Sequence, residues 1–346
     1  MNTSTHGGDI YAFAEKIGCS PSDIIDFSSN IHFEQAVNWR ELPLNLQPYA
    51  DPHYTDLKHA IKQRYALTEN VDLEVFNGAS AAIFALLRHL RPEKLVLYAP
   101  IFSDYERAAS AAFGFDPEYF EDGIEIIDRF DDDVYFEPVP ENSTIIFTNP
   151  ATPDGKLYDL TAYLKFWKDA SCTIIIDESF LDFCDAPSMM QFIKEYKKLF
   201  IVKSLCKFYG CAGVRVGFIA GNGVSNIHSY ESSWRISTFD SVYMQAALQN
   251  TAFIEHTRTE TKRLRALLEQ VLRDSNLFEE IYDGSANFVL ARLKNDELDL
   301  QKQLASSRIL IRECASFDGL TNQDIRFAVK SETDIKKLAD ALSCLN

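Results

Sequence analysis

The feature that most restricts the fold is a series of short, continuously apolar segments separated by helical stretches. Ile174, Ile175 and Ile176 form one such run, and Leu199–Val202 forms the next. A strand that is apolar at every position must be buried on both faces of its sheet. Such strands alternating with helices are typical of a mostly parallel sheet. We therefore predict an α/β fold whose ligands bind at the carboxyl ends of the strands.

The same alternation extends over the first two thirds of the chain. Helices are predicted at residues 10–17, 57–65, 81–90 and 162–168. Further strands are predicted at residues 73–75, 95–97, 144–147 and 214–219. Residues 121–133 are acidic and are predicted to form a solvated surface segment.

From residue 224 the pattern becomes mainly helical, with a long amphipathic helix at 253–272. The tail reads as strand 287–290, helix 298–306, strands 309–312 and 325–329, and helix 333–342, which indicates a second, smaller lobe. Four parts are expected. They are an N-terminal segment, 1–40, that packs on the small lobe and the active site, a large domain, 41–225, a helical linker, 226–250, and a small C-terminal domain, 251–346.

Composition argues against several kinds of partner. The formal net charge of −17 disfavours nucleic acid and anionic membranes, because both require a basic face. No segment has the length of a membrane span, and no signal-peptide pattern is present. The 7 cysteines include no CxxC pair, and Cys206 and Cys211 lack the second pair of a metal site. We expect a reduced, cytoplasmic protein without a metal.

Lys207 lies in a turn between the apolar run that ends at Val202 and a glycine-punctuated strand that carries Arg215. A lysine at such a position is either solvated or functional, because burying an ammonium group is costly. Burial among other cations lowers the pKa of an amine and makes it a nucleophile. Lys207 is therefore the candidate catalytic residue, with an ordinary solvated turn lysine as the alternative.

Other polar and aromatic residues follow neighbouring strands. Asp177 ends the isoleucine strand, and it is either a partner of Lys207 around one ligand or a helix N-cap. Gly78, Ala79 and Ser80 open a helix, where backbone N–H groups and the helix dipole bind anions. Together with Ser204 and Arg215 they would cradle a phosphate, and Phe102 offers a flat ring or is simply a core aromatic. The ligand implied is planar, phosphorylated and carbonyl-bearing, which describes pyridoxal 5′-phosphate (PLP).

Three segments carry a resemblance to a known family. They are His6-Gly7-Gly8 with the following Asp26–Ile31, the block Asp177–Phe183, and the lysine stretch Ser204–Gly217. The chain resembles the fold-type I PLP-dependent enzymes from His6 to about Lys330. It is most similar to the group of histidinol-phosphate aminotransferase and, within it, to the threonine-phosphate decarboxylase of cobalamin biosynthesis. The resemblance implies the aspartate aminotransferase-like fold and makes the large domain the PLP-binding one.

The resemblance also implies roles for individual residues. Lys207 would bind PLP covalently and move protons at the substrate Cα, and Asp177 would pair with the pyridinium nitrogen. The remaining cofactor contacts would come from Ala79, Ser80, Phe102, Asn149, Thr152, Ser204 and Arg215, and from Tyr49 reaching across a homodimer interface. For the substrate, Arg326 would bind the carboxylate and Arg312 the phosphate, while His6 and Asn30 would line the entrance.

The chain departs from the family pattern at three places. Thr152 stands where an asparagine usually bonds the phenolic oxygen of PLP, and Cys206 replaces a serine or threonine beside the lysine. His32-Phe33-Glu34 lacks the Pro- and Gly-rich run of many relatives, so we expect the substrate gate to be built differently. Phe180 favours the decarboxylase, because transaminase relatives usually have tyrosine at this position.

Three functions are therefore open. The first is decarboxylation of a small phosphorylated amino acid, O-phospho-L-threonine or O-phospho-L-serine. The second is histidinol-phosphate aminotransfer, and the third is binding without catalysis by a PLP-fold protein. The two phospho-amino acids differ by one methyl group, which a pocket distinguishes by only ~1–3 kcal/mol. The sequence leaves this choice open.

Overall fold

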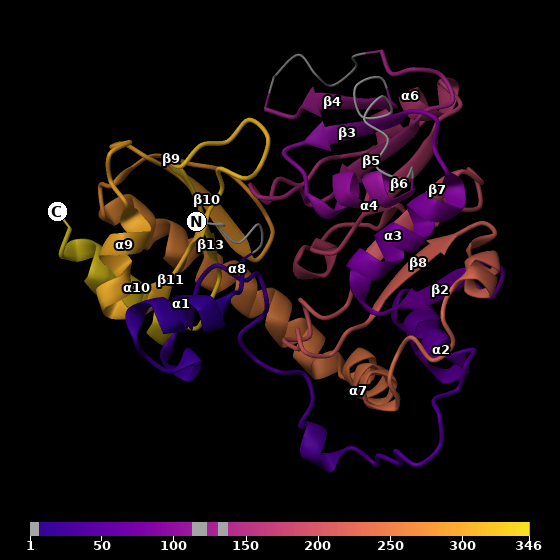
Figure 1. Cartoon of the computed structure of the whole chain (residues 1–346), viewed down its shortest axis with the longest axis horizontal. Coiled ribbons are helices and arrows are strands. Elements are labelled where there is room, and N and C mark those ends of the chain that lie inside the picture. The colour runs from indigo at the N-terminus through magenta and orange to yellow at the C-terminus, as the bar shows by residue number, and fades with distance from the viewer. Residues whose placement is uncertain (1–6, 113–122, 131–137, 346) are drawn as a thin grey trace.

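The computed structural model describes residues 7–112, 123–130 and 138–345, which form two lobes (Figure 1). The large lobe contains a seven-stranded sheet in the order β2-β8-β7-β6-β5-β3-β4. Only β8 runs antiparallel to its neighbours, so the prediction of a mostly parallel sheet is confirmed. The strands are β2 (Leu73–Phe76), β3 (Leu95–Ala99), β4 (Ile124–Asp128), β5 (Thr144–Thr148), β6 (Thr173–Asp177), β7 (Leu199–Ser204) and β8 (Gly217–Gly221).

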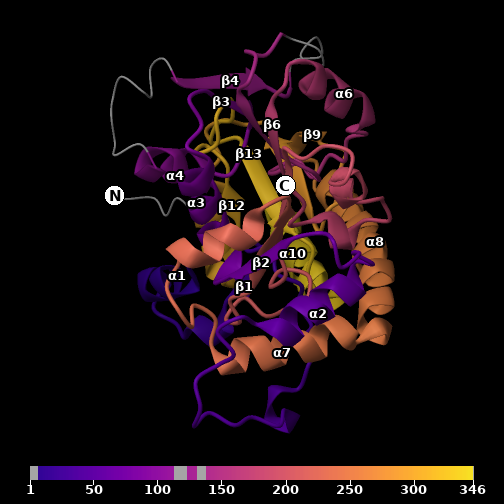
Figure 2. The ribbon, with the colours of Figure 1, turned by 90° about the vertical axis from the view of Figure 1, so that its right-hand side faces the viewer.

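Helices cover both faces of this sheet, which explains its continuously apolar strands. Ile174 and Ile176 pack in the core under α2 (Thr55–Arg64), α6 (Thr161–Asp169) and α7 (Thr238–Gln249). Ile175 points to the other face and packs under α3 (Gly78–Leu90) and α4 (Asp104–Ala112). Figure 2 shows α2 and α7 lying side by side along the same face. All three isoleucines are at most 1% exposed, so the run is buried from both sides.

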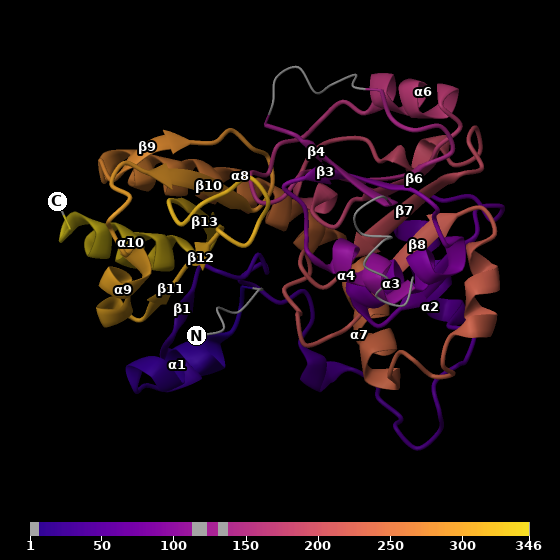
Figure 3. The same ribbon diagram turned by 45° about the horizontal axis from the view of Figure 1, so that its top comes forward.

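The small lobe is an antiparallel sheet in the order β12-β13-β10-β9, covered by helices (Figures 1 and 3). The long helix α8 (Thr251–Asp274) packs on β9 and β10, and its Leu264, Leu268 and Leu272 enter the core. In β12 and β13, Arg312 pairs directly with Arg326. The other elements are β9 (Phe278–Ile281), β10 (Phe288–Leu293), α9 (Leu300–Leu304), β11 (Ile309–Leu310), β12 (Arg312–Glu313), β13 (Asp324–Ala328) and α10 (Glu332–Ser343).

The N-terminal segment lies on the small lobe and then passes to the large one. After α1 (Ile10–Ile17), β1 (Ile25–Asp26) pairs in parallel with β11. The Lys330 Nζ donates to the carbonyl oxygens of Ser29 (2.9 Å) and Ile31 (3.2 Å). The N–H of His32 donates to the carbonyl of Lys207 at 2.9 Å. Residues 28–32 are thereby held between the small lobe and the lysine turn. The domain boundaries themselves remain a prediction.

Two predicted elements differ from the structure, and the helix α4 and the strand β9 were not predicted. The acidic segment contains the edge strand β4, in which Glu125 and Ile126 are exposed; residues 121–122 and 131–133 lie outside the described residues. The strand predicted at 309–312 is two strands, because β11 pairs with β1 whereas β12 pairs with β13. The edge strand β9 was not predicted, because edge strands are short and half-solvated.

Short 3₁₀ helices complete the described part of the chain: η1 (Pro21–Asp23), η2 (Trp39–Glu41), η4 (Leu181–Phe183), η5 (Met189–Phe192), η6 (Val224–Tyr230) and η7 (Ala305–Ser307). Within residues 7–112, 123–130 and 138–345, none of the helices is both long and apolar enough to cross a lipid bilayer.

Candidate active site

A cavity of about 230 Å³ lies where the N-terminal segment and the two lobes meet. Its wall combines residues 28–31, the ends of strands β5 and β6, the lysine turn, and β12 and β13 of the small lobe. The position agrees with the expectation that ligands collect at the carboxyl ends of parallel strands. Seven of the predicted site residues line it: Asn30, Phe102, Thr152, Asp177, Lys207, Arg312 and Arg326.

Lys207 lies in the turn after β7, and its Nζ is 3.9 Å from the centre of the Phe180 ring. Burial lowers the pKa of this amine to about 8, and the positive charges of Arg326 and Arg215 act in the same direction. Asp177 opposes the shift by favouring the ammonium form. At neutral pH about one amine in ten is thus unprotonated, a far larger fraction than for an ordinary lysine.

Asp177 ends β6, the strand next to β7, as the register of the sheet requires. Its Oδ2 accepts a hydrogen bond of 2.7 Å from the Tyr105 hydroxyl, and its Oδ1 accepts one of 2.8 Å from the Ser179 N–H. The side chain is buried and these two bonds orient the carboxylate. Burial, followed by the charge of Asp177, raises the pKa of Tyr105 well above its usual value, so its hydroxyl remains a donor.

Tyr105 was not predicted as a site residue. It lies on α4, and nothing in the local pattern Ser103-Asp104-Tyr105 separates it from a core aromatic. Its contact with Asp177 joins residues 72 positions apart in the chain. Only the packing of α4 on the sheet creates that contact.

The N-terminus of α3 lies against Arg215. Gly78 has φ of 81°, and a Cβ at this position would lie 2.5 Å from the Arg215 Nη2. A Cβ on Gly217 would lie 2.5 Å from the Ala79 nitrogen, so this glycine allows the close approach of β8 and the helix. The guanidinium group therefore adds its charge to the N–H groups of the first turn, which contains Ala79 and Ser80.

Ser204, the last residue of β7, is buried, and its N–H donates to Ser179 Oγ at 3.0 Å. Arg215 itself donates to the Ala212 carbonyl (3.3 Å) and to Cys206 Sγ (3.9 Å). Cys206 thus contacts the arginine through its sulfur. These residues lie beside the cavity, at the helix terminus, and not among those that line it.

Two buried arginines face the cavity from adjacent strands. Arg326 donates to Thr152 Oγ1 (3.2 Å) and to the Ser28 carbonyl (3.1 Å). Arg312 donates to Ser316 Oγ at 2.7 Å, and its guanidinium carbon lies 5.6 Å from the centre of the Phe317 ring. Burial lowers the pKa of both, that of Arg326 to about 10. Two neighbouring cations attract negatively charged groups, so this wall is suited to an anionic ligand.

The cavity wall fits PLP and its substrate in a second respect. Among the described residues, Asn30 Oδ1, Thr148 Oγ1 and Arg326 Nε are buried without a hydrogen-bond partner. All three residues line the cavity. Buried polar atoms normally have partners, so three such atoms around one cavity indicate a polar ligand there. With a carboxylate, an amine of lowered pKa and an anion-binding helix terminus nearby, the residues present fit PLP.

Three predicted residues lie elsewhere or are not described. The Asn149 amide donates to the Tyr158 carbonyl and accepts from the Tyr158 N–H, both at 3.0 Å. Tyr49 is 78% exposed and stacks on Trp234 with ring centroids 4.3 Å apart. His6 lies outside the described residues. The roles given to these residues remain predictions.

With this geometry, comparison with known proteins identifies the class. Residues 35–342 match the aminotransferase class I and II family, to which the chain therefore belongs. The family comprises PLP-dependent enzymes. A histidinol-phosphate aminotransferase from Sinorhizobium meliloti, solved with PLP, has 16% identity and a TM-score of 0.78, covering 98% of this chain and 94% of that one. The predicted fold and cofactor are thus confirmed.

Individual relatives have two different names. The threonine-phosphate decarboxylase of Salmonella typhimurium is 26% identical over 98% of this chain and 96% of its own length. The bifunctional adenosylcobalamin biosynthesis protein CobDQ of Leptospira interrogans is 28% identical over 99% of this chain, which spans 41% of that protein. The histidinol-phosphate aminotransferase structure from Clostridium acetobutylicum has 28% identity and a TM-score of 0.79, covering 92% of this chain and 98% of that one.

The pKa of Lys207 predicts how its reaction with PLP depends on pH. Only the neutral amine attacks a carbonyl, so the rate of capture should rise about tenfold per pH unit below pH 8 and level off above it. Borohydride trapping after short incubations, followed by mass spectrometry of the Lys207 peptide, measures that rate. Lys207→Ala provides the background. A pH midpoint of the capture rate near the pKa of a free lysine would show that burial does not lower the pKa of this amine.

Gly78 provides a test of the helix terminus. In Gly78→Ala the new Cβ meets the Arg215 guanidinium and φ is strained, so PLP should bind at least tenfold more weakly, as measured by fluorescence titration. The matched control is Gly18→Ala, since Gly18 also has positive φ (73°) but no atom within 4 Å of its Cβ position. Unchanged PLP affinity in Gly78→Ala would show that Arg215 and the N-terminus of α3 do not belong to the cofactor site.

Proposed function

We propose that the protein is a PLP-dependent decarboxylase of an O-phospho-L-amino acid, either O-phospho-L-threonine or O-phospho-L-serine or both. The product is 1-aminopropan-2-yl phosphate or ethanolamine phosphate, for the nucleotide loop of a cobamide. The observation that carries the proposal is the pair of buried arginines, Arg312 and Arg326, directly opposite each other on β12 and β13. A phospho-amino acid has two anionic groups, and this wall has two cations to bind them.

The residues divide the work between cofactor and substrate. When bound, PLP supplies the electron sink for the pair released at the substrate Cα. Asp177, held by Tyr105 and Ser179, provides the fixed negative charge for its ring nitrogen. Ala79, Ser80, Ser204 and Arg215 are assigned to its phosphate, and Phe102 to its ring face. Lys207, with a pKa of about 8, is suited to hold the cofactor and to exchange a proton at Cα.

Substrate orientation determines which bond breaks, and Phe180 and the named relatives favour decarboxylation. Arg326 is fixed by Thr152 and Ser28, so a carboxylate bound to it is held in one orientation. Phe180 places a ring without a hydroxyl 3.9 Å from Lys207 Nζ. The decarboxylase and the cobalamin-pathway protein among the relatives agree with this assignment.

A homodimer is part of the proposal. Tyr49 and Trp234 stack on each other at the surface, and they are 78% and 46% exposed, respectively. Exposed aromatic pairs are enriched in protein interfaces, and Tyr49 would there reach the cofactor phosphate of the second subunit. Asn149 and Thr152 are assigned to the ring side of the cofactor site, and Asn30 and His6 to the substrate entrance.

Histidinol-phosphate aminotransfer is the second candidate. The match to the aminotransferase from Clostridium acetobutylicum, at 28% identity and a TM-score of 0.79, favours it specifically. That reaction uses histidinol phosphate, a phosphorylated amine, and 2-oxoglutarate, a dicarboxylic keto acid, in turn, so the same arginines could serve it. Binding without catalysis is the third possibility.

The deciding experiment supplies the PLP-loaded protein with each substrate separately. We expect CO₂ and the aminoalkyl phosphate from O-phospho-L-threonine or O-phospho-L-serine, measured by gas detection and mass spectrometry. Glutamate formed from 2-oxoglutarate and histidinol phosphate, without CO₂ from either phospho-amino acid, would assign the aminotransferase instead. No product from any substrate, with PLP bound to the protein, would support the non-catalytic alternative.

Replacing Arg312 tests how strongly recognition of the substrate phosphate contributes to kcat/KM. In Arg312→Met, kcat/KM for the phospho-amino acid should fall about 10–100-fold, because a charge-assisted hydrogen bond to the phosphate is lost. Arg292→Met is the control, since Arg292 lies in the same sheet but pairs with Asp324 outside the cavity. Equal losses in the two variants, by steady-state kinetics, would exclude Arg312 from substrate recognition.

A further inference from the structure

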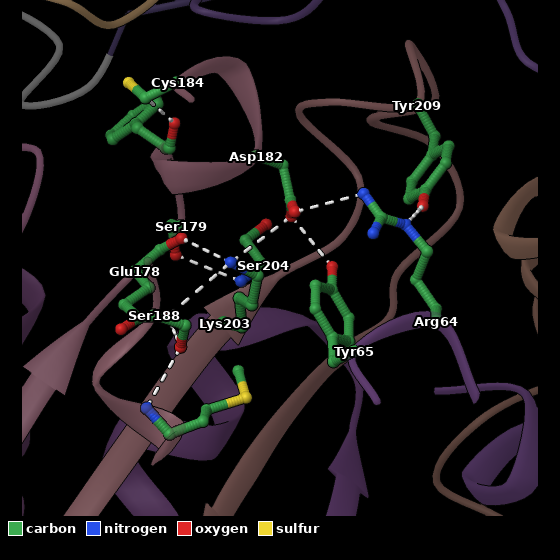
Figure 4. A network of polar contacts seen from close by, with 12 residues as sticks. Arg64, Tyr65, Glu178, Ser179, Asp182, Cys184, Ser188, Lys203, Ser204 and Tyr209 are labelled. Carbon is green, nitrogen blue, oxygen red and sulfur yellow. Dashed lines mark hydrogen bonds and ion pairs between the residues drawn. The ribbon is translucent and has the colours of Figure 1, made fainter. Parts of the chain in front are cut away.

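A buried network of charges lies behind the cavity (Figure 4). At its centre is Lys203, on β7, four positions before Lys207 and 1% exposed. The Lys203 Nζ lies 3.4 Å from Asp182 Oδ2 and 3.8 Å from Glu178 Oε2, and it donates to the Glu178 carbonyl at 3.2 Å. This ammonium is therefore not part of the cavity but is enclosed by the turn that follows Asp177.

Asp182 extends the network to the far side of the lysine turn. It accepts from the Tyr65 hydroxyl at 2.8 Å and from Arg64 Nη2 at 3.5 Å. The Arg64 Nε in turn donates to the hydroxyl of Tyr209 at 3.2 Å. Lys203 precedes Lys207 by four residues and Tyr209 follows it by two. The network thus contacts the chain on both sides of the reactive amine.

The other arm of the network holds the turn that carries Asp177. Glu178 accepts from Ser188 Oγ at 2.6 Å and from the Met189 N–H at 2.7 Å. Burial raises its pKa, and the charge of Lys203 opposes that shift. Ser179 donates its N–H to Asp177 and accepts from the N–H of Ser204, so the carboxylate turn and the end of β7 are tied together.

A buried ion is stable only with its partners in place, so the network has one favourable arrangement of its two turns. We infer that the Lys203–Asp182 ion pair is a positioning device that holds the Lys207 turn and the Asp177 turn in register with each other. Neither Lys203 nor Asp182 lines the cavity. The inference rests on the roles proposed above for Lys207 and Asp177, and it adds residues that act only through them.

The test is Lys203→Met, which keeps the length of the side chain and removes the charge. We expect PLP to bind about tenfold more weakly in a fluorescence titration, because supporting residues fix the geometry of a site. The pH midpoint of the visible absorbance of bound PLP should move upward. The loss of a nearby cation favours the protonated form of the chromophore.

Lys58→Met is the matched control. Lys58 forms a closer ion pair, at 2.8 Å, with the buried Glu74 on the edge strand β2. This variant should lower the thermal midpoint of the protein without PLP, while PLP affinity and the absorbance midpoint stay unchanged. Lys203→Arg should partly restore the PLP affinity and the absorbance midpoint, because it returns the positive charge.

Tyr209→Phe covers the case in which Lys203→Met does not fold, since it removes a single hydroxyl at the other end of the network. It should weaken PLP binding several-fold. If folded Lys203→Met, or Tyr209→Phe in its place, binds PLP within twofold of the unaltered protein with an unchanged absorbance midpoint, the inference is wrong. By contrast, a visible PLP band that survives in Lys207→Ala would overturn the proposed role of Lys207 itself.

Discussion

The burial of an amine at the ends of parallel strands is the constraint on which the other features of this protein depend. Lys207 loses solvation there, which lowers its pKa to about 8. A fraction of the molecules therefore has a neutral, nucleophilic amine at neutral pH. The same burial requires nearby counter-charge, and Asp177 supplies it from the next strand. The continuously apolar strands that build the buried sheet are thus also what makes the reactive amine possible.

Cations outnumber anions on the cavity wall, whereas the buried charges outside it are paired. Three cations, Lys207, Arg312 and Arg326, line the cavity of a protein whose net charge is −17, and Arg215 lies beside it. Local groups, and not the overall field, therefore have to attract an anionic cofactor and substrate. Behind the cavity the charges are balanced in pairs, as in Lys203 with Asp182, where no ligand is needed to complete them.

Much of the fold and part of the site could be predicted from the sequence. Periodicity located most helices and strands, because burial on one or both faces leaves a direct pattern in the residues. Edge strands β4 and β9 were not predicted, since half of each faces solvent. Asp177 and Lys207 were predicted together because both follow strands, whereas the pairing of Tyr105 with Asp177 depends on how α4 packs.

The sequence by itself determined the α/β class, the buried strands, the candidate lysine and the family resemblance, because these depend on local pattern and motif. Only the tertiary structure decided which distant groups meet. Arg326 reaches Thr152 across 174 positions, and Arg312 faces Arg326 through the pairing of β12 with β13. Such contacts depend on the packing of whole lobes, and hydrogen bonds and charges act only over a few ångströms.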